Sequence, residues 1–117
     1  MTQEEKQLLL TDLCARLPYR VKGLTNGRKV TIYSFDIGDL QNDLRTIKPY
    51  LRPMSSMTEE EKKEFHHVAS LQRNYLGDDI FYTHWQIYDW LNKNYFDYRG
   101  LISKGLALEA PEEMYKN

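Results

Sequence analysis

The chain has 117 residues, with 16 basic and 17 acidic side chains, one cysteine and a net charge of −1. This length supports one hydrophobic core, and a single cysteine excludes an intrachain disulfide scaffold. No apolar run reaches the roughly 18 residues of a membrane span, and the acidic start at residues 1–6 is atypical of a signal peptide. We therefore predict a cytoplasmic protein with one domain, residues 1–117, and no membrane partner.

Residues 1–17 are predicted to form a helix. It opens on a capping box, in which the side chains of Thr2 and Glu5 each bond the other's backbone amide, and Pro18 ends it. Apolar side chains recur at helical spacing along one face, namely Leu10, Leu13, Cys14 and Leu17. This spacing places Cys14 in the core as an inert thiol and not as a nucleophile.

Two strands, Tyr19–Leu24 and Arg28–Ile37, are predicted on either side of Asn26-Gly27. This dipeptide tolerates the positive φ angles of a type I′ turn and favours a hairpin. The apolar alternation of the second strand slips by one residue after Ile32, which predicts a bulge near residues 33–34. A loop is then expected to start at residues 37–39.

The segment Thr46–Pro53 is predicted to be extended. Pro49 and Pro53 forbid a regular helix and argue against a central strand. We therefore expect either an edge strand or a strapping segment, which completes a β-rich region over residues 18–54.

Residues 58–110 read as helical. Capping boxes at Thr58/Glu61 and Thr83/Gln86 predict helices that start there, the first about 17 residues long and the second ending near Tyr95. Residues 97–104 can form a short helix, and residues 111–117 read as a flexible tail. The predicted fold class is α+β: an N-terminal helix, a small antiparallel and SH3-like sheet, and two to three C-terminal helices.

Charge is distributed unevenly along the chain. Residues 16–54 hold eight basic and three acidic side chains, a local balance of +5, whereas the flanking segments balance at −2 and −4. A local positive field attracts anionic partners even when the net charge is near zero.

Basic residues also alternate along the predicted strands, so that they share faces. The candidate binding residues are Arg20, Lys22, Arg28, Lys29, Lys48, Tyr50 and Arg52. Mobile cations suit phosphates, and the Tyr50 ring offers a platform for a stacked base. The pattern predicts a binding module for nucleic acid or for an acidic protein. Alternatively, the same face meets the chain's own acidic helix Glu59–Glu64, or is simply solvated.

A second hypothesis is a protein–protein adaptor or an inhibitor. Tyr and Trp are enriched at protein interfaces, and the helix around residues 83–95 is rich in them. The candidate interface residues are Tyr82, Trp85, Tyr88, Trp90 and Tyr98, with Trp85 and Trp90 off the stripe of Ile87 and Leu91.

No catalytic or cofactor motif is visible, so we predict a protein that is not an enzyme and binds no cofactor. Glu64 and His67 have the i, i+3 spacing of a bundle metal site but lack further ligands. The position of Asp78-Asp79 after Gly77 and before a helix favours a role in a turn or a helix cap over Mg²⁺ binding. We therefore predict no metal site and no catalytic residues.

Three blocks of sequence carry a resemblance: residues 13–19 (LCARLPY), residues 47–58 (IKPYLRPMSSMT) and residues 97–111 (DYRGLI…KGLA…AP). The chain resembles a family of small uncharacterised proteins from gut Bacteroidetes and their prophages and mobile elements. The resemblance implies a bacterial cytosol or an infected cell and a mobile-element role. It brings no known activity, catalytic residue or cofactor.

Overall fold

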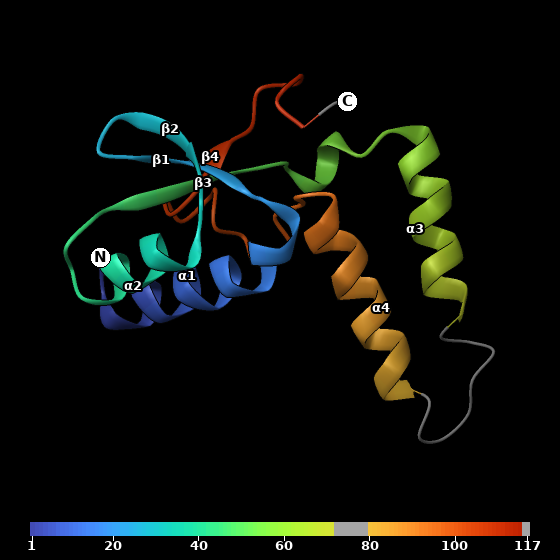
Figure 1. Ribbon diagram of the computed structural model, residues 1–117. Helices are drawn as coiled ribbons and strands as arrows, with labels where there is room; N and C mark the ends of the chain where they lie inside the picture. The colour runs from blue at the N-terminus through green and yellow to red at the C-terminus, as the bar shows by residue number, and fades with distance from the viewer. Residues whose placement is uncertain (72–79, 116–117) are drawn as a thin grey trace.

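The computed structural model describes residues 1–71 and 80–115, with the backbone alone for residues 71 and 80–84. Four helices, two 3-10 turns and four strands follow one another along these residues (Figure 1). In chain order they are α1 (Gln3–Arg16), η1 (Leu17–Tyr19), β1 (Lys22–Thr25), β2 (Arg28–Thr31), α2 (Ser34–Gln41), β3 (Ile47–Leu51), η2 (Met54–Ser56), α3 (Glu59–Leu71), α4 (Ile80–Lys93) and β4 (Leu108–Glu109).

The strands form one sheet in the order β2-β1-β3-β4, antiparallel except for the parallel pair β3–β4. Helices α1 and α2 cover one face of this sheet (Figure 1). The predicted α+β class is confirmed. The SH3-like arrangement is not confirmed, because the sheet is open and ends in a parallel pair.

The core lies between the sheet and helices α1 and α2. Its buried members come from α1, from β3 and the residues next to β1 and β2, from α2 and from the turns before β4: Leu9, Leu13, Val21, Ile32, Ile37, Leu40, Ile47, Leu51, Leu101, Leu106 and Ala107. The predicted hairpin forms, with Asn26 at φ 50° and Gly27 at φ 80°.

Helix α1 starts at the predicted capping box, where the Glu5 amide donates to Thr2 Oγ1 at 3.0 Å. Three of the four residues of its predicted apolar face contact the core, because Leu13 is buried and Leu10 and Leu17 are partly buried and pack against it. The prediction of Cys14 as a core thiol is wrong, because Cys14 is exposed. The buried side chains of the helix are Leu9, Asp12, Leu13 and Arg16. Asp12 and Arg16 neutralise each other by ion pairing, so they can be buried where the sequence suggests solvated charges.

The second strand ends at Thr31, and residues 34–41 form helix α2 instead of the predicted strand, bulge and loop. The Asp36 carboxylate accepts from the Tyr33 amide at 2.9 Å, which caps the first turn of this helix. The slip in apolar alternation after Ile32 therefore marks the change from a strand to a helical period.

Strand β3 is an interior strand, so its predicted place at an edge is wrong. Strand β4 pairs only with Tyr50 and Leu51, and at Pro49 the strand has a neighbour on one side alone. A proline is tolerated there because no second ladder needs its amide. On the paired side, Pro49 faces Gly23 of β1.

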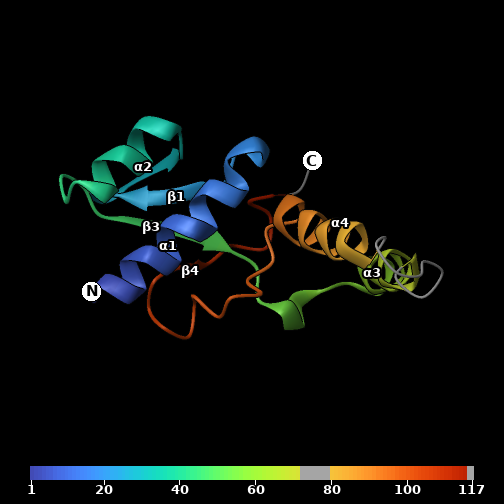
Figure 2. The same cartoon turned by 90° about the horizontal axis from the view of Figure 1, so that it is seen from below.

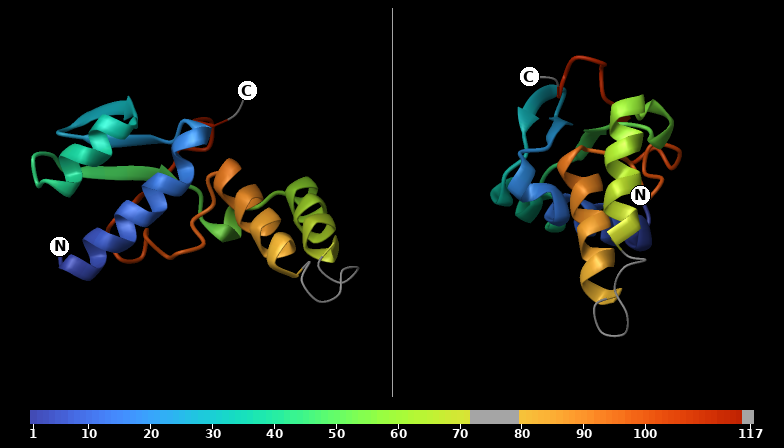
Figure 3. Two further views of the ribbon diagram at one scale, coloured as in Figure 1. Left: turned by 60° about the horizontal axis from the view of Figure 1, so that its bottom comes forward. Right: turned by 90° about the vertical axis from the view of Figure 1, so that its right-hand side faces the viewer.

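Helices α3 and α4 pack against each other and extend away from the sheet (Figures 2 and 3). Helix α3 starts after the predicted capping box, in which the Glu61 amide donates to Thr58 Oγ1 at 3.1 Å. Helix α4 starts at Ile80, three residues before the predicted cap at Thr83. The predicted break at residues 77–79 lies outside the described residues.

Residues 97–105 form turns and not the predicted short helix. The Asp97 carboxylate accepts from the amides of Leu101 and Ile102 at 2.8 and 2.9 Å, an alternative to helical bonding. We expected a flexible tail from Pro111. The structure describes turns at residues 112–115 that contact the sheet, and residues 116–117 lie outside the described residues.

Candidate interaction surface

The face of the sheet opposite α1 and α2 carries basic side chains, and we call it the outer face. The register pairs Lys22 with Thr31, and Leu24 with both Lys29 and Lys48. Paired residues and those two positions along a strand share a face. The outer face therefore consists of Lys22, Leu24, Lys29, Thr31, Lys48 and Tyr50.

The structure brings most of the predicted binding residues together, but not all of them. Lys22, Lys29, Lys48 and Tyr50 lie on the outer face, whereas Arg28 pairs with Thr25 next to the hairpin turn and belongs to the opposite face. Arg20 is not in strand β1: its backbone is left-handed at φ 56° and closes the turn η1. The expected alternation of Arg20 and Lys22 along one strand is therefore wrong.

Arg52 does not belong to the surface either, because it holds the two helices to the sheet. Its guanidinium makes two bonds to the Glu61 carboxylate, at 2.6 and 2.7 Å, and lies 4.3 Å from the Phe96 ring centre. These hydrogen bonds from Arg52 lower the pKa of Glu61 to about 2. For Arg52 the alternative prediction is confirmed, because this basic residue pairs with an acid of the helix Glu59–Glu64.

Five of the eight basic residues in the segment 16–54 are exposed: Arg20, Lys22, Arg28, Lys29 and Lys48. Arg16, Arg45 and Arg52 have carboxylate partners. Among residues 1–71 and 80–115, the salt bridges involve none of the five. Three of these five cations, Lys22, Lys29 and Lys48, lie on the outer face.

Tyr50 is buried even though it lies on the outer face. The Lys29 ammonium lies 5.8 Å from the centre of its ring, within the range of a cation–π contact. Its ring is therefore no open platform for a stacked base, which was one of the two features that suggested nucleic acid, the other being the mobile cations.

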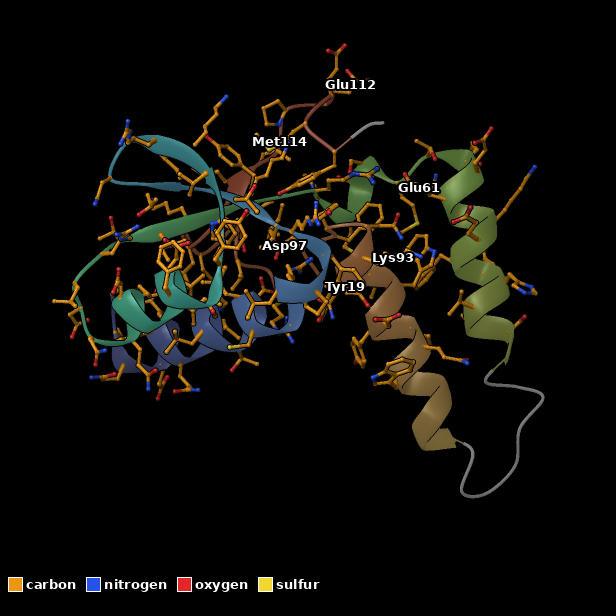
Figure 4. The ribbon with its side chains drawn as sticks, viewed as in Figure 1. Tyr19, Glu61, Lys93, Asp97, Glu112 and Met114 are labelled. Atoms are coloured by element: carbon orange, nitrogen blue, oxygen red, sulfur yellow. The ribbon has the colours of Figure 1, made fainter. Side chains whose placement is uncertain are left out.

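Residues 110–115 lie over part of the outer face, and we call them the covering segment. Figure 4 labels two of its residues, Glu112 and Met114, on the side of the sheet opposite α1 and α2. The Tyr115 hydroxyl accepts from the Lys22 amide at 3.0 Å and donates to the Tyr50 carbonyl at 2.7 Å. Burial raises the pKa of Tyr115.

A cavity of about 480 Å³ separates the covering segment from the hairpin. Its lining combines residues of both: Lys22, Lys29, Val30, Thr31, Pro111, Glu113 and Met114. The sequence prediction missed this contribution. The sequence does contain acidic residues next to an aromatic one at residues 111–115 (PEEMY), but we interpreted this run as part of a flexible tail.

The alternative aromatic surface is only partly open. Trp85 is 62% exposed and Tyr88 49% exposed, one turn apart on α4. Trp90 instead packs between Phe65 and Phe96, at 5.6 Å from each ring centre. The side chain of Tyr82 lies outside the described residues.

In the part of the chain that the structure describes, no group of three or more His, Cys, Asp or Glu side chains could hold a metal ion. The acidic pair Asp78-Asp79 and the side chain of His84 lie outside that part. Within the same part, no helix combines the length and apolar character needed to cross a membrane.

Comparisons with protein-family models, with curated protein sequences and with solved structures find no match to this chain. The resemblance to the Bacteroidetes family therefore stays a prediction. A function for the outer face must therefore be argued from the arrangement of its own residues.

Proposed function

We propose that this protein is a non-enzymatic binding module whose outer face takes an acidic segment of a partner protein. The observation that carries the proposal is the set of exposed cations on one small sheet face: Lys22, Lys29 and Lys48. Like charges gathered without carboxylate partners attract anions and steer their approach.

An acidic protein is favoured over nucleic acid for two reasons. The buried Tyr50 ring cannot stack on a base, and stacking supplies much of single-strand binding. The cavity beside the lysines is also lined by Glu113, and a carboxylate there would repel a phosphate backbone. A protein segment can place its acids beside Lys22 and Lys29 and a neutral residue beside Glu113.

The free edge of the sheet gives such a segment a place for its backbone. Strand β2 pairs only with β1, so its other side is an edge of the sheet. An extended segment can add to a sheet edge through main-chain hydrogen bonds. Lys29 on β2 would then lie next to its acids on the outer face.

Affinity purification of the tagged protein from its native cell, with and without nuclease, tests this function. We expect an acidic protein that survives nuclease and is lost from the variant with Lys22, Lys29 and Lys48 changed to Glu. The matched control carries Lys62, Lys63 and Lys93 changed to Glu, because these exposed lysines lie on α3 and α4. Recovery of nucleic acid that disappears with nuclease would reject the acidic-protein proposal.

The adaptor hypothesis keeps one specific observation in its favour. Trp85 and Tyr88 together expose aromatic surface on one side of α4, and such residues often anchor protein interfaces. If this is the site, Trp85→Ala abolishes recovery of the partner and the lysine variant does not.

A further inference from the structure

The covering segment is fastened to the sheet at both of its ends. At the first end, strand β4 pairs with β3 and the Ala110 amide then donates to the Leu51 carbonyl at 2.7 Å. At the second end, Tyr115 bridges β1 and β3 through its hydroxyl and stacks on Tyr95, with ring centres 3.6 Å apart. Between these ends the chain turns, with the Met114 amide donating to the Pro111 carbonyl at 3.0 Å.

The middle of the segment fits the outer face loosely. Glu113 lines the same cavity as Lys22 and Lys29. Among the described residues neither lysine has a salt bridge, so the Glu113 carboxylate is more than 4.0 Å from both ammonium groups. The Lys22 ammonium instead reaches the Met114 carbonyl at 3.5 Å. Glu113 and the two lysines thus line the same cavity without forming an ion pair.

The Tyr115 hydroxyl, which anchors the second end, lies where the ladder between β1 and β3 would continue. The ladder between β1 and β3 ends at the pair Gly23–Pro49. One position further, the Tyr115 hydroxyl lies between the Lys22 amide and the Tyr50 carbonyl and bonds both. A tyrosine that follows acidic residues is therefore recognised by backbone groups next to the basic cluster.

We propose that residues 110–115 act as an internal, autoinhibitory ligand, and that the partner segment has the same chemistry. That chemistry is an acidic residue followed, two positions later, by a tyrosine, as in Glu113 and Tyr115. This inference rests on the proposed function and adds to it the partner's sequence class and a means of regulation. The tethered segment competes at a high effective concentration, and its looser middle allows a better-fitting segment in trans to displace it.

The test is a binding titration of a fluorescein-labelled peptide with the sequence of residues 110–115, followed by fluorescence anisotropy at low salt. The peptide is added to the full chain and to its Tyr115→Ala variant. A competing internal segment lowers apparent affinity by the fraction of open molecules. We expect the variant to bind about tenfold more tightly, as loss of one stacked and hydrogen-bonded anchor would give.

Two further variants make the result specific. Tyr88→Ala removes an exposed tyrosine from α4 and should bind like the unmodified chain. Tyr115→Phe keeps the ring on Tyr95 and loses only the hydroxyl bonds, so about a threefold gain is expected even if Tyr115→Ala does not fold. Circular dichroism checks the fold of each variant.

The outcomes separate this inference from the proposed function. Equal or weaker peptide binding by both folded Tyr115 variants overturns the internal ligand. If a ten-residue polyglutamate then still binds the full chain and is lost with Lys22→Glu/Lys29→Glu, the proposed function stands alone. If neither peptide binds any variant, both fail. A wild-type chain that forms dimers at the concentrations used would assign the segment to a second copy and would also overturn the inference.

Discussion

Asp12 and Arg16 lie one turn apart in α1, have no solvent exposure, and join through two hydrogen bonds of 2.9 and 3.0 Å. The same carboxylate accepts from Arg99 at 2.6 Å, and Arg16 also donates to the Phe96 carbonyl at 2.6 Å. The pair therefore ties α1 to the turns that follow α4. A buried charge left without its partner is strongly destabilising.

We expect Asp12→Ala to lower the free energy of unfolding by about 3 kcal/mol, because it leaves two guanidinium groups without their carboxylate. Asp43→Asn is the control, because the backbone of Asp43 is left-handed at φ 58°, a conformation that Asn tolerates better than Ala. Asp43 also holds a basic residue, Lys6, at 2.9 Å, but its side chain is 80% exposed, and such pairs contribute about 0–1 kcal/mol. Urea unfolding measures both, and similar losses would contradict the structural role of the buried pair.

Gly23 marks a close approach of strands that no side chain can enter. A Cβ there would lie 2.6 Å from Ile32 Cδ1, 2.9 Å from the Lys48 carbonyl oxygen and 3.2 Å from Pro49 Cα. Gly23→Ala should therefore cost about 1–3 kcal/mol. Gly38→Ala in α2 meets nothing within 4 Å and should stabilise by about 0.5–1 kcal/mol. In thermal unfolding we expect a lower melting temperature for Gly23→Ala and a higher one for Gly38→Ala.

The Arg52–Glu61 pair predicts how stability responds to acid. Because the pKa of Glu61 falls from 4.5 to about 2 in the folded chain, the unfolded state binds the proton first as the pH falls. The pair's contribution is complete above pH 4.5 and is lost between about pH 4.5 and 2. After allowance for solvent screening, we expect a loss on the order of 1–2 kcal/mol.

Urea unfolding at several pH values tests this dependence. Glu61→Gln should remove that part of the acid dependence. Glu59→Gln, whose parent side chain is 85% exposed, should keep it. An unchanged acid profile in Glu61→Gln would show that the pair does not govern this range.

Alkaline pH should weaken the anchor of the covering segment. Burial raises the pKa of Tyr115 and of Tyr95, and the hydrogen bond to Asp89 raises the pKa of Tyr19. An unfolded tyrosine ionises near pH 10, so these three contribute stability below about pH 10 and lose it as the pH rises further. Tyr115→Phe should show a shallower loss by circular dichroism above pH 10, and the same slope as the wild type would contradict this.

Local patterns predicted the elements that depend on a few neighbouring residues. The capping boxes at Thr2 and Thr58 and the turn at Asn26-Gly27 are all present, since each is fixed by short-range hydrogen bonds or φ angles. Elements that depend on distant partners were missed. Helix α2 was read as a strand because Phe35 and Ile37 suit both structures in sequence, and Cys14 was placed in the core because the Asp12–Arg16 pair could not be foreseen.

The candidate site was predictable in part for the same reason. Alternation along β3 correctly put Lys48 and Tyr50 on one face, and the register then added Lys22 and Lys29. The loss of Arg52 to Glu61 and the arrival of Tyr115 beside Lys22 depend on tertiary contacts of residues 9 and 93 positions apart. Alternation within a strand cannot reveal such contacts.

A nuclear magnetic resonance titration of the full chain with a ten-residue polyglutamate locates the binding surface most directly. If the outer face binds acidic segments, amide shifts will move at Lys22, Lys29 and Lys48, and the changes will fade as salt rises. Changes confined to α4 around Trp85 and Tyr88, or none at low salt, would contradict a binding site on this face of the sheet.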